Sequence, residues 1–481
     1  MHVLSTRRCF GLLASLAAAF FFQTAQAIDV DGTVTEFATS GGLVERCVRI
    51  KPFPGARYSD HDEEAEKGFC ALDLEQHALC PKLWSTSPGT VVFTVAGGES
   101  GIDEFERTHC GDGHHASDFA EDKPAVFKLS VNGQKTSATY APSSWVYYHL
   151  SRYFQTEVFV PPAVYRSMDR EAHHRRVVTP ALTLMEGRHA RMLSEGWKYL
   201  DALETNGLGG TAARQALTDG GRQVFGVLID NKGDRAGMEV NGTRESGWGD
   251  GQNEDFQQTA AYLALRDPAS PAEAASASVR KARRNPKMAR ALDEATPVEQ
   301  VYAWMQAVME IALLDTILGQ QDRIGNIDER WRWFWVEDGQ LKNHSAHGDE
   351  RPGSVPAGAA WRLKQTIISD NDAGIRPGYT NFAVRTGMLE GLAHFDPRLY
   401  QRLGALADAL RKGGEANLWL TGAAGLTERE ARGIAERSQA AFESLKAQCE
   451  AGTLKLDFDL VALLSGDTLP PPASCDLAPL P

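Results

Sequence analysis

The sequence predicts a two-lobed α+β protein with a β-rich front half and a helical back half. Residues 28–140 are rich in Gly, Thr, Val and Asp and contain short β-like runs, whereas helical periodicity dominates from about residue 255. Acidic turns follow the clearest helix and a tryptophan-rich strand at the start of the back half. A β-sandwich joined to an unrelated helical domain would give the same order of elements, so order alone leaves that alternative open.

The first 27 residues have the pattern of an export signal. Arg7 and Arg8 precede an apolar stretch at 11–22, and Ala25-Gln26-Ala27 gives the small-residue cleavage pattern. The stretch is too short to span a bilayer as a stable helix, so no membrane anchor is expected. The arginine pair also resembles a twin-arginine signal. We therefore expect a periplasmic or secreted protein.

Charge and cysteine content indicate which partners and which disulfides to expect. Removing the signal takes away two positive charges and no acids, so the net charge changes from −13 to −15. Such an acidic chain repels nucleic acid and anionic lipid, and we expect neither as a partner. An even number of cysteines in an exported chain predicts disulfides. Cys449–Cys475 is the expected local pair, and the pairing among the first four is left open. The six are Cys47, Cys70, Cys80, Cys110, Cys449 and Cys475.

The front half, taken here as 28–254, is expected to form the β-rich lobe. Strands are predicted at 90–95, 125–131 and 224–229, helices at 142–154 and 179–204, an extended segment at 158–165 and a loop at 241–254. Pro142 is placed to open its helix. Asn132-Gly133 directly after a strand predicts a hairpin. Gly97 to Gly101 is expected to be a hairpin turn, with a phosphate-cradling loop as the alternative.

The back half, 255–460, is expected to be the helical lobe, followed by a Pro-rich tail at 461–481. Its clearest helix is predicted to start with a capping box of Thr296 and Glu299 and to end at Gly319. Strands are predicted at 330–336 and 363–369, and helices at 396–412 and 427–449. The first of these strands places three tryptophans on one face.

Two acidic turns and one lysine are the candidate site. Asp322 follows the long helix, and Asp370 lies in the turn Ser-Asp-Asn-Asp-Ala-Gly at 369–374. An acid that orients a hydroxyl, followed by an acid that holds a metal, is the pair that phosphotransferases use, together with a strand lysine for the phosphates. Lys128 alternates with apolar neighbours and fits that strand position. Each also has an ordinary interpretation, as a turn residue or an edge-strand lysine.

The segment after Lys128 resembles the secretory-pathway kinases, the Golgi casein kinase and its relatives. His149-Leu150-Ser151-Arg152 and Pro161-Pro162-Ala163-Val164 are similar to a helix reading Ala-Phe-His-Leu-Asp-Arg-Ile-Leu and a strand reading Val-Pro-Pro-Val. Asp322-Arg323-Ile324 resembles the family's Asp-Arg-His loop, and 370–375 resembles its Asp-Asn-Gly-x-Gly-Phe loop. The resemblance covers four short segments in the family's order and implies a two-lobed protein-kinase-like fold.

The resemblance also implies a site and its ligands. Lys128 would bind the phosphates of ATP or another nucleotide, and Asp322 would be the catalytic aspartate. Asp370 would hold Mn²⁺ or Mg²⁺, with Asp372 able to take its place and Asn326 as a second ligand. The reaction would move a γ-phosphoryl group to a hydroxyl of a protein or sugar acceptor.

Departures from the family keep other functions open. Ser144 stands where the family has a Glu that pairs with the lysine or the metal, and Asp103, Glu104 or Glu106 would have to replace that acid. A catalytically degenerate binding protein is therefore the alternative. A metal-dependent hydrolase is a third reading, based on possible ligands in two loops. Those ligands are Asp112, His114, His115 and Asp118 in one loop and His344, His347 and Asp349 in the other.

Overall fold

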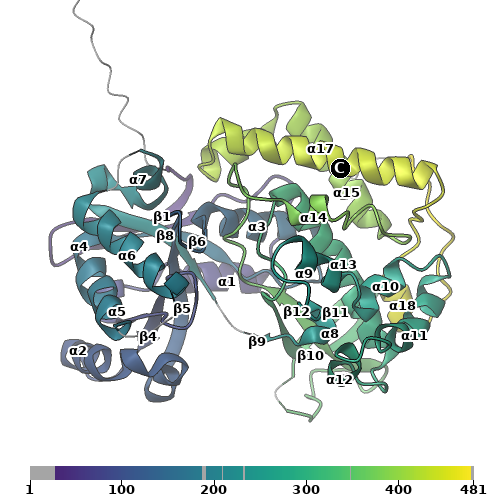
Figure 1. The fold of residues 1–481 in the computed structure, drawn as a ribbon, viewed down its shortest axis with the longest axis horizontal. Helices are drawn as coiled ribbons and strands as arrows, with labels where there is room; N and C mark the ends of the chain where they lie inside the picture. The colour runs from purple at the N-terminus through teal and green to yellow at the C-terminus, as the bar shows by residue number, and fades with distance from the viewer. Residues whose placement is uncertain (1–27, 187–190, 208–209, 231–232, 347, 478–481) are drawn as a thin grey trace, which may run out of the picture.

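The computed structural model describes residues 28–186, 191–207, 210–230, 233–346 and 348–477 and shows two lobes side by side (Figure 1). The predicted α+β class, with an antiparallel sheet in front and helices behind, is confirmed. The export segment expected at residues 1–27, like His347, lies outside the described residues.

The first lobe is built on one antiparallel sheet in the order β1-β2-β6-β8-β5-β4-β3, with β7 paired to β8. Its strands are β1 (Gly32–Ala38), β2 (Val44–Ile50), β3 (Ala78–Pro81), β4 (Thr90–Thr94), β5 (Asp122–Leu129), β6 (Ala163–Asp169), β7 (Leu217–Thr218) and β8 (Gln223–Ile229). Its helices are α1 (Asp60–Phe69), α2 (Gly98–His109), α3 (Ala141–Phe154), α4 (Arg170–His173), α5 (Thr179–Leu184), α6 (Arg191–Asn206) and α7 (Thr211–Ala216). A single sheet replaces the sandwich that the sequence left possible.

The second lobe surrounds a small sheet with helices. The sheet has the order β11-β10-β12, with β9 on β10, and consists of β9 (Asp234–Arg235), β10 (Ile327–Glu337), β11 (Gln340–Ser345) and β12 (Ala360–Ile368). The helices are α8 (Met238–Asn241), α9 (Asp250–Phe256), α10 (Ala260–Leu265), α11 (Pro271–Ala282), α12 (Met288–Ala291), α13 (Val298–Leu318), α14 (Phe382–Arg385), α15 (Pro397–Arg411), α16 (Glu415–Leu418), α17 (Glu428–Glu450) and α18 (Leu460–Ser465). The chain changes lobes between β8 and β9, before the division expected at residue 254.

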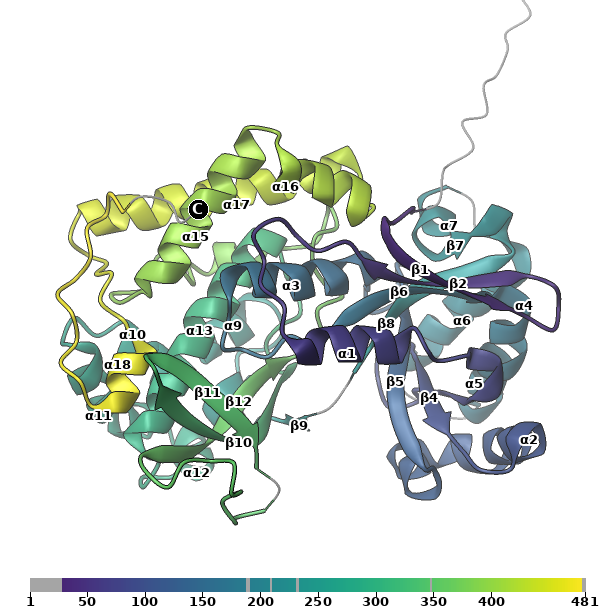
Figure 2. The same cartoon turned by 180° about the vertical axis from the view of Figure 1, so that it is seen from behind.

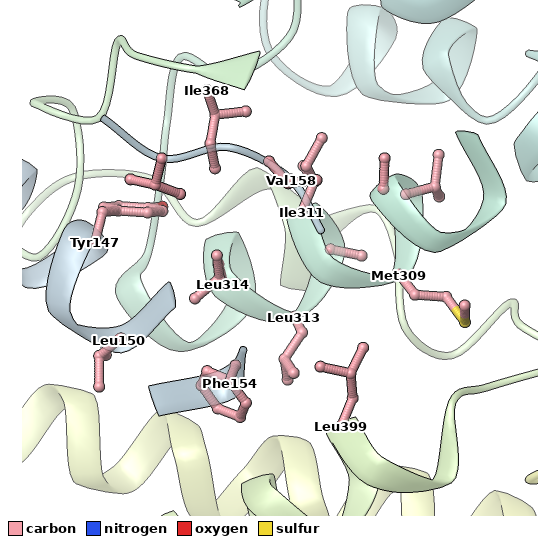
Figure 3. Packing of buried hydrophobic residues seen from close by; sticks show 14 of the residues in the cluster. Tyr147, Leu150, Phe154, Val158, Met309, Ile311, Leu313, Leu314, Ile368 and Leu399 are labelled. Carbon is pink, nitrogen blue, oxygen red and sulfur yellow. The ribbon is translucent and has the colours of Figure 1, made fainter. Parts of the chain in front are cut away.

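Helix α3 joins the two lobes through one core. Every residue of α3 except Arg152 is buried, so the helix has no solvent-facing side. Figure 3 shows Tyr147 and Phe154 of α3 beside Leu313 and Leu314 of α13. Burying each such side chain stabilises the fold by roughly 1.5–3 kcal/mol. Since the same helix packs on β6 and β8, the front sheet and the helical lobe share a core.

Helix α13 is the central helix of the second lobe. It is long and apolar enough to cross a membrane by length and composition, but it is almost entirely buried inside the protein. Gly319 ends it at φ 67°, as predicted. The predicted capping box is wrong, because Pro297 is the N-cap and the Thr296 hydroxyl donates instead to the carbonyl of Asp293.

Three loop predictions need correction. Asn132-Gly133 makes a short turn between β5 and α3 and no hairpin, since the chain closes only through the Val131–Thr139 backbone pair. Gly97 is the left-handed N-cap of α2, so 97–101 is neither a hairpin turn nor a loop over Lys128. The segment 241–254 contains part of α8 and the start of α9, where a loop was expected.

The described residues contain three disulfides. Cys449 is bonded to Cys475, as predicted, and the pairs left open are Cys47–Cys70 and Cys80–Cys110. The first fastens the end of α1 to β2, and the second fastens β3 to the segment after α2. Disulfides persist in oxidising environments, so this protein belongs to an oxidising, extracytoplasmic compartment.

Candidate functional site

The structure brings Lys128 together with both acids of the 369–374 turn. The Lys128 Nζ lies 2.6 Å from Asp370 Oδ1 and 3.3 Å from Asp372 Oδ2. Lys128 sits in β5 opposite Val227 of β8, and β12 ends two residues before Asp370. Residues more than 240 positions apart in sequence therefore meet where the lobes join.

The electrostatics of this group are strongly coupled. Burial would lower the pKa of Lys128, but Asp370 and Asp372 outweigh it and raise the pKa above its usual range. Burial likewise would raise the pKa of Asp370, but Lys128 and then Lys82 hold it well below its usual range. The lysine and the carboxylate are therefore both charged at neutral pH. The Asp370 side chain is 24% exposed and Lys128 only 4%, so Asp370 is the member that solvent reaches.

Lys82 is a second lysine at this site, and the sequence did not single it out. It follows β3, and its amide donates to the Gly89 carbonyl across the β3–β4 loop. Gly89 lies against Lys128, since a Cβ there would be 3.7 Å from Lys128 Cγ. Burial, then repulsion by Lys128, lowers the pKa of Lys82 to about 8. Among the described residues, no carboxylate lies within ion-pair distance of its ammonium group.

Asp322 faces the same acidic turn from the opposite loop. Its Oδ1 accepts a hydrogen bond of 3.2 Å from the indole nitrogen of Trp248, whose side chain is 64% exposed. Burial raises the pKa of Asp322, with further contributions from Asp370 and Asp372. An indole donates but does not accept. A carboxylate has two acceptor oxygens, so a hydroxyl that is to be oriented by Asp322 would bind Oδ2 or take the place of the Trp248 N–H at Oδ1.

Asn326 does not present a free oxygen to the acidic turn. Its amide nitrogen donates to the Asp322 carbonyl at 2.8 Å, and its Oδ1 accepts from Arg235 at 3.1 Å. Arg235 also reaches Asp370 Oδ2 at 3.4 Å and Asp328 Oδ1 at 3.1 Å. Arg235 therefore occupies the space between the residues proposed to bind metal, and no sequence pattern had indicated this arginine.

A buried ion pair fixes the geometry of both loops. Arg323 and Asp315 are 3.1 Å apart, and each side chain is only 3% exposed. The same guanidinium donates to Asn371 Oδ1 at 2.7 Å, and Tyr147 of α3 donates to Asp315 at 2.8 Å. The pair thus ties the end of α13 to the 369–374 turn and to α3. Charge-assisted hydrogen bonds of this kind are the stronger ones.

The 369–374 turn is pressed against α3 and the end of α13. The Tyr140 amide donates to the Asp372 carbonyl at 2.5 Å, and the Ile375 amide donates to Leu318 at 2.6 Å. A Cβ on Gly374 would lie 2.7 Å from Ser143 Oγ, closer than such atoms approach. Glycine is therefore required here for close contact.

The acid expected by resemblance has no replacement among the three candidates. Ser144 is buried, and its Oγ has no hydrogen-bond partner in the described part of the chain. Glu104 pairs with Arg107 in α2, and Glu106 pairs with Arg176. Asp103 shows no contact with Lys128. The carboxylates that hold Lys128 are instead those of the acidic turn itself.

The residues that carry the resemblance in α3 have structural roles. Arg152 forms a two-pronged ion pair with Asp62 of α1 at 2.7 and 2.9 Å and donates to the Val160 carbonyl. His149 is buried, burial lowers its pKa to about 3, and its Nδ1 lies 2.5 Å from the Tyr58 hydroxyl. These contacts fix α3 to the first disulfide-linked segment.

The histidine loops do not form a metal centre in the part of the chain that the structure describes, where no group of three potential His, Cys, Asp or Glu ligands is found. His114 packs against Trp84, and His115 pairs with Asp118. His344 contacts the Ser345 carbonyl, and Asp349 pairs with Arg362.

No protein-family model matches this chain, and no curated protein matches it significantly. The assignment of function therefore depends on the geometry of the site.

Proposed function

We propose that this protein is an exported, kinase-like phosphotransferase that moves the γ-phosphoryl group of a nucleotide to a hydroxyl acceptor. The observation that carries the proposal is the meeting of Lys128 with Asp370 and Asp372, with Asp322 on the facing loop. A strand lysine, a metal-binding acid and a hydroxyl-orienting acid are the parts that phosphoryl transfer requires.

Each residue has a distinct role in this proposal. Lys82 and Lys128 bind the phosphates, and Lys82 forms no ion pair among the described residues, although the charges of Asp370 and Asp372 act on it. Asp322 orients the acceptor hydroxyl, and Trp248 holds the carboxylate until the acceptor arrives. The raised pKa of Asp322 suits a group that accepts a proton as the new phosphate ester forms. The acceptor is a protein or a sugar.

Carboxylate oxygens are the ligands that Mg²⁺ and Mn²⁺ prefer, but Lys128 and Arg235 already contact the carboxylates of the acidic turn, and the described residues contain no group of three possible ligands. A divalent cation would therefore have to displace one of these contacts. Asp370, the more exposed acid, is the first ligand we propose, and Asp372 the second. Asn326 fits less well, since Arg235 already holds its Oδ1. When bound, the cation would neutralise phosphate charge. Lys128 and Arg235 supply part of that positive charge without it.

A second candidate is a catalytically degenerate member that binds ligands without transferring phosphate. The observation that favours it is that Lys128 is already held by two carboxylates while Ser144 replaces the family's acid. In that case the ion pairs serve mainly to fasten the lobes together. The two candidates differ in whether phosphate is transferred, but they involve the same site around Lys128, Asp322 and Asp370.

The test measures binding and transfer separately on the mature protein. Nucleotide binding is followed by thermal shift with ATP, with and without Mn²⁺, and transfer by release of labelled γ-phosphate to protein and sugar acceptors. We expect Asp322→Ala to abolish transfer and leave nucleotide binding nearly unchanged, because its contact matters in the transition state. We expect Asp370→Ala to lose the Mn²⁺-dependent part of binding.

Asp467→Ala is the matched control, since Asp467 is an exposed acid remote in sequence from both loops. Binding without transfer to any acceptor, unchanged by Asp322→Ala, would favour the degenerate candidate. A wild-type protein that binds no nucleotide under any condition would reject both the phosphotransferase and a nucleotide-binding degenerate form.

A further inference from the structure

A cavity lies on one face of the lobe junction. Figure 2 shows α1 of the first lobe approaching the β10–β12 sheet of the second lobe on this face. The cavity between them measures about 550 Å³ and is lined from both lobes. This volume lies within the range of small-molecule pockets and exceeds the space that a single ion needs.

The cavity is positively charged although the whole protein is acidic. Arg57, Arg330 and Arg332 line it, and in the described ranges none of them has a carboxylate within ion-pair distance. A fourth arginine, Arg152, is fully engaged with Asp62. Burial, reinforced by Arg332, lowers the pKa of Arg330 to about 10, and Asp230 only partly offsets this. A group of neighbouring arginines without carboxylate partners is typical of a site that binds an anion.

Two acidic residues, Asp62 and Glu157, also line this cavity, but their negative charge does not neutralise the three arginines. Asp62 accepts both prongs of Arg152 and is therefore already neutralised. Burial raises the pKa of Glu157 to about 7, so its negative charge at neutral pH is weaker than that of an ordinary glutamate. Three arginines then face at most one partly charged acid.

The arginines are held in place by their surroundings. Arg330 stacks on the Phe159 ring at 4.0 Å and donates from Nε to Gln365 at 3.2 Å. Arg332 donates from Nε to Asn343 at 2.7 Å. Arg330, stacked and anchored at Nε, keeps its terminal N–H groups for another acceptor, whereas Arg332 also donates from one terminal nitrogen to Ser345 Oγ at 3.3 Å and keeps the other. Anchoring reduces the entropy that is lost when a ligand binds.

We propose that this cavity binds a small molecule carrying a phosphate or sulfate ester group. Guanidinium groups form two-pronged hydrogen bonds with such oxyanions, and three arginines match the three terminal oxygens of an ester. A single carboxylate offers only two oxygens and would leave one arginine without a partner. The remaining volume accommodates the rest of the molecule. None of the residues that line this cavity belongs to the proposed phosphotransferase site of Lys128, Asp322 and Asp370, and the inference does not depend on the proposed reaction.

The experiment uses the mature protein and four probes at equal ionic strength: glucose 6-phosphate, glucose 6-sulfate, glucose and acetate. Affinity is measured by calorimetry. We expect one or both esters to bind and glucose and acetate not to bind, and the comparison of the esters identifies the source of the anion. Arg57→Gln and Arg332→Gln are each expected to weaken ester binding tenfold or more. Arg57 is exposed, so its variant tests the site even if Arg332→Gln destabilises the fold.

Two control variants test whether the esters bind at the proposed phosphotransferase site or through the overall positive charge of the surface instead of in this cavity. Lys82→Met removes a cation of the phosphotransferase site and should leave ester binding unchanged, and so should Arg280→Gln, which removes an exposed arginine of α11. Loss of ester binding in Lys82→Met together with full binding in Arg57→Gln and Arg332→Gln would place the ester at the phosphotransferase site and overturn the proposal. Esters that bind no better than acetate would also overturn it.

Discussion

Neutralising Asp315 should destabilise the protein strongly, because Arg323 would then be a buried charge without its partner. Both side chains are 3% exposed, so solvent cannot replace the lost interaction. Removing one partner of a buried pair costs about 3–5 kcal/mol, a large fraction of the roughly 5–15 kcal/mol by which proteins of this kind are stable. Asp315→Asn keeps the shape but removes the charge and replaces one acceptor oxygen by an NH2 group, which cannot accept a hydrogen bond from Arg323.

Urea unfolding followed by tryptophan fluorescence would measure this loss. Arg323→Met should cost a similar amount, since it leaves the Asp315 carboxylate buried beside Tyr147. The double variant should lose about 1–3 kcal/mol less than the sum of the two, because the residues interact directly. Asp408→Asn, which breaks an exposed pair with Arg411, is the control and should not change stability measurably. Additive losses, or an Asp315→Asn variant as stable as the wild type, would refute the reasoning.

Four further outcomes follow from the site and the disulfides. With the pKa of Lys82 near 8, the lysine loses its charge as pH rises from 7 to 9, so ATP affinity should fall over this range in the wild type; an equal fall in Lys82→Met would contradict this. Ser144→Glu should reduce transfer, because a further buried acid would compete for Lys128; higher activity would show that the family's acid was missing. Gly374→Ala should weaken Mn²⁺-dependent binding by displacing the acidic turn, and unchanged Mn²⁺ titrations would argue against the close contact. Replacing Cys449 and Cys475 by Ser should lower the free energy of unfolding by about 3–4 kcal/mol in urea, since the bond closes a 26-residue separation; reducing agent should then have a smaller effect on the variant than on the wild type.

Local patterns in the sequence predicted the elements that position the site. Pro142 and the apolar run after it located α3 almost to the residue, and Gly319 marked the end of α13. These signals work because backbone preferences at Pro and Gly do not depend on distant residues. The capping box at Thr296 failed because of a competing local contact: the Thr296 hydroxyl donates to the Asp293 carbonyl, three residues earlier in the chain.

The residues that surround the site could not be found in this way. Three of them lie in or beside loops, where no periodicity marks them: Lys82, Arg235 and Trp248. Each is recognised as part of the site only through its interaction with a residue far away in sequence. Lys128 and Asp370 were predicted from the residue types that phosphoryl transfer needs and from the resemblance to a kinase family. Their direct contact, without an acid from α3 between them, required the packed structure.

Lys82 and Lys128 differ in how far nearby carboxylates compensate their positive charges. Lys128 is 4% exposed and satisfies two carboxylates, so its first effect is to allow Asp370 and Asp372 to stay ionised next to each other. Lys82 has no such partner, and burial beside Lys128 already lowers its pKa. An incoming anion would relieve the strain on Lys82, whereas it would have to compete with carboxylates at Lys128. On the proposed function, we expect Lys82 to distinguish phosphate-bearing from neutral ligands, and Lys128 to keep Asp370 and Asp372 ionised.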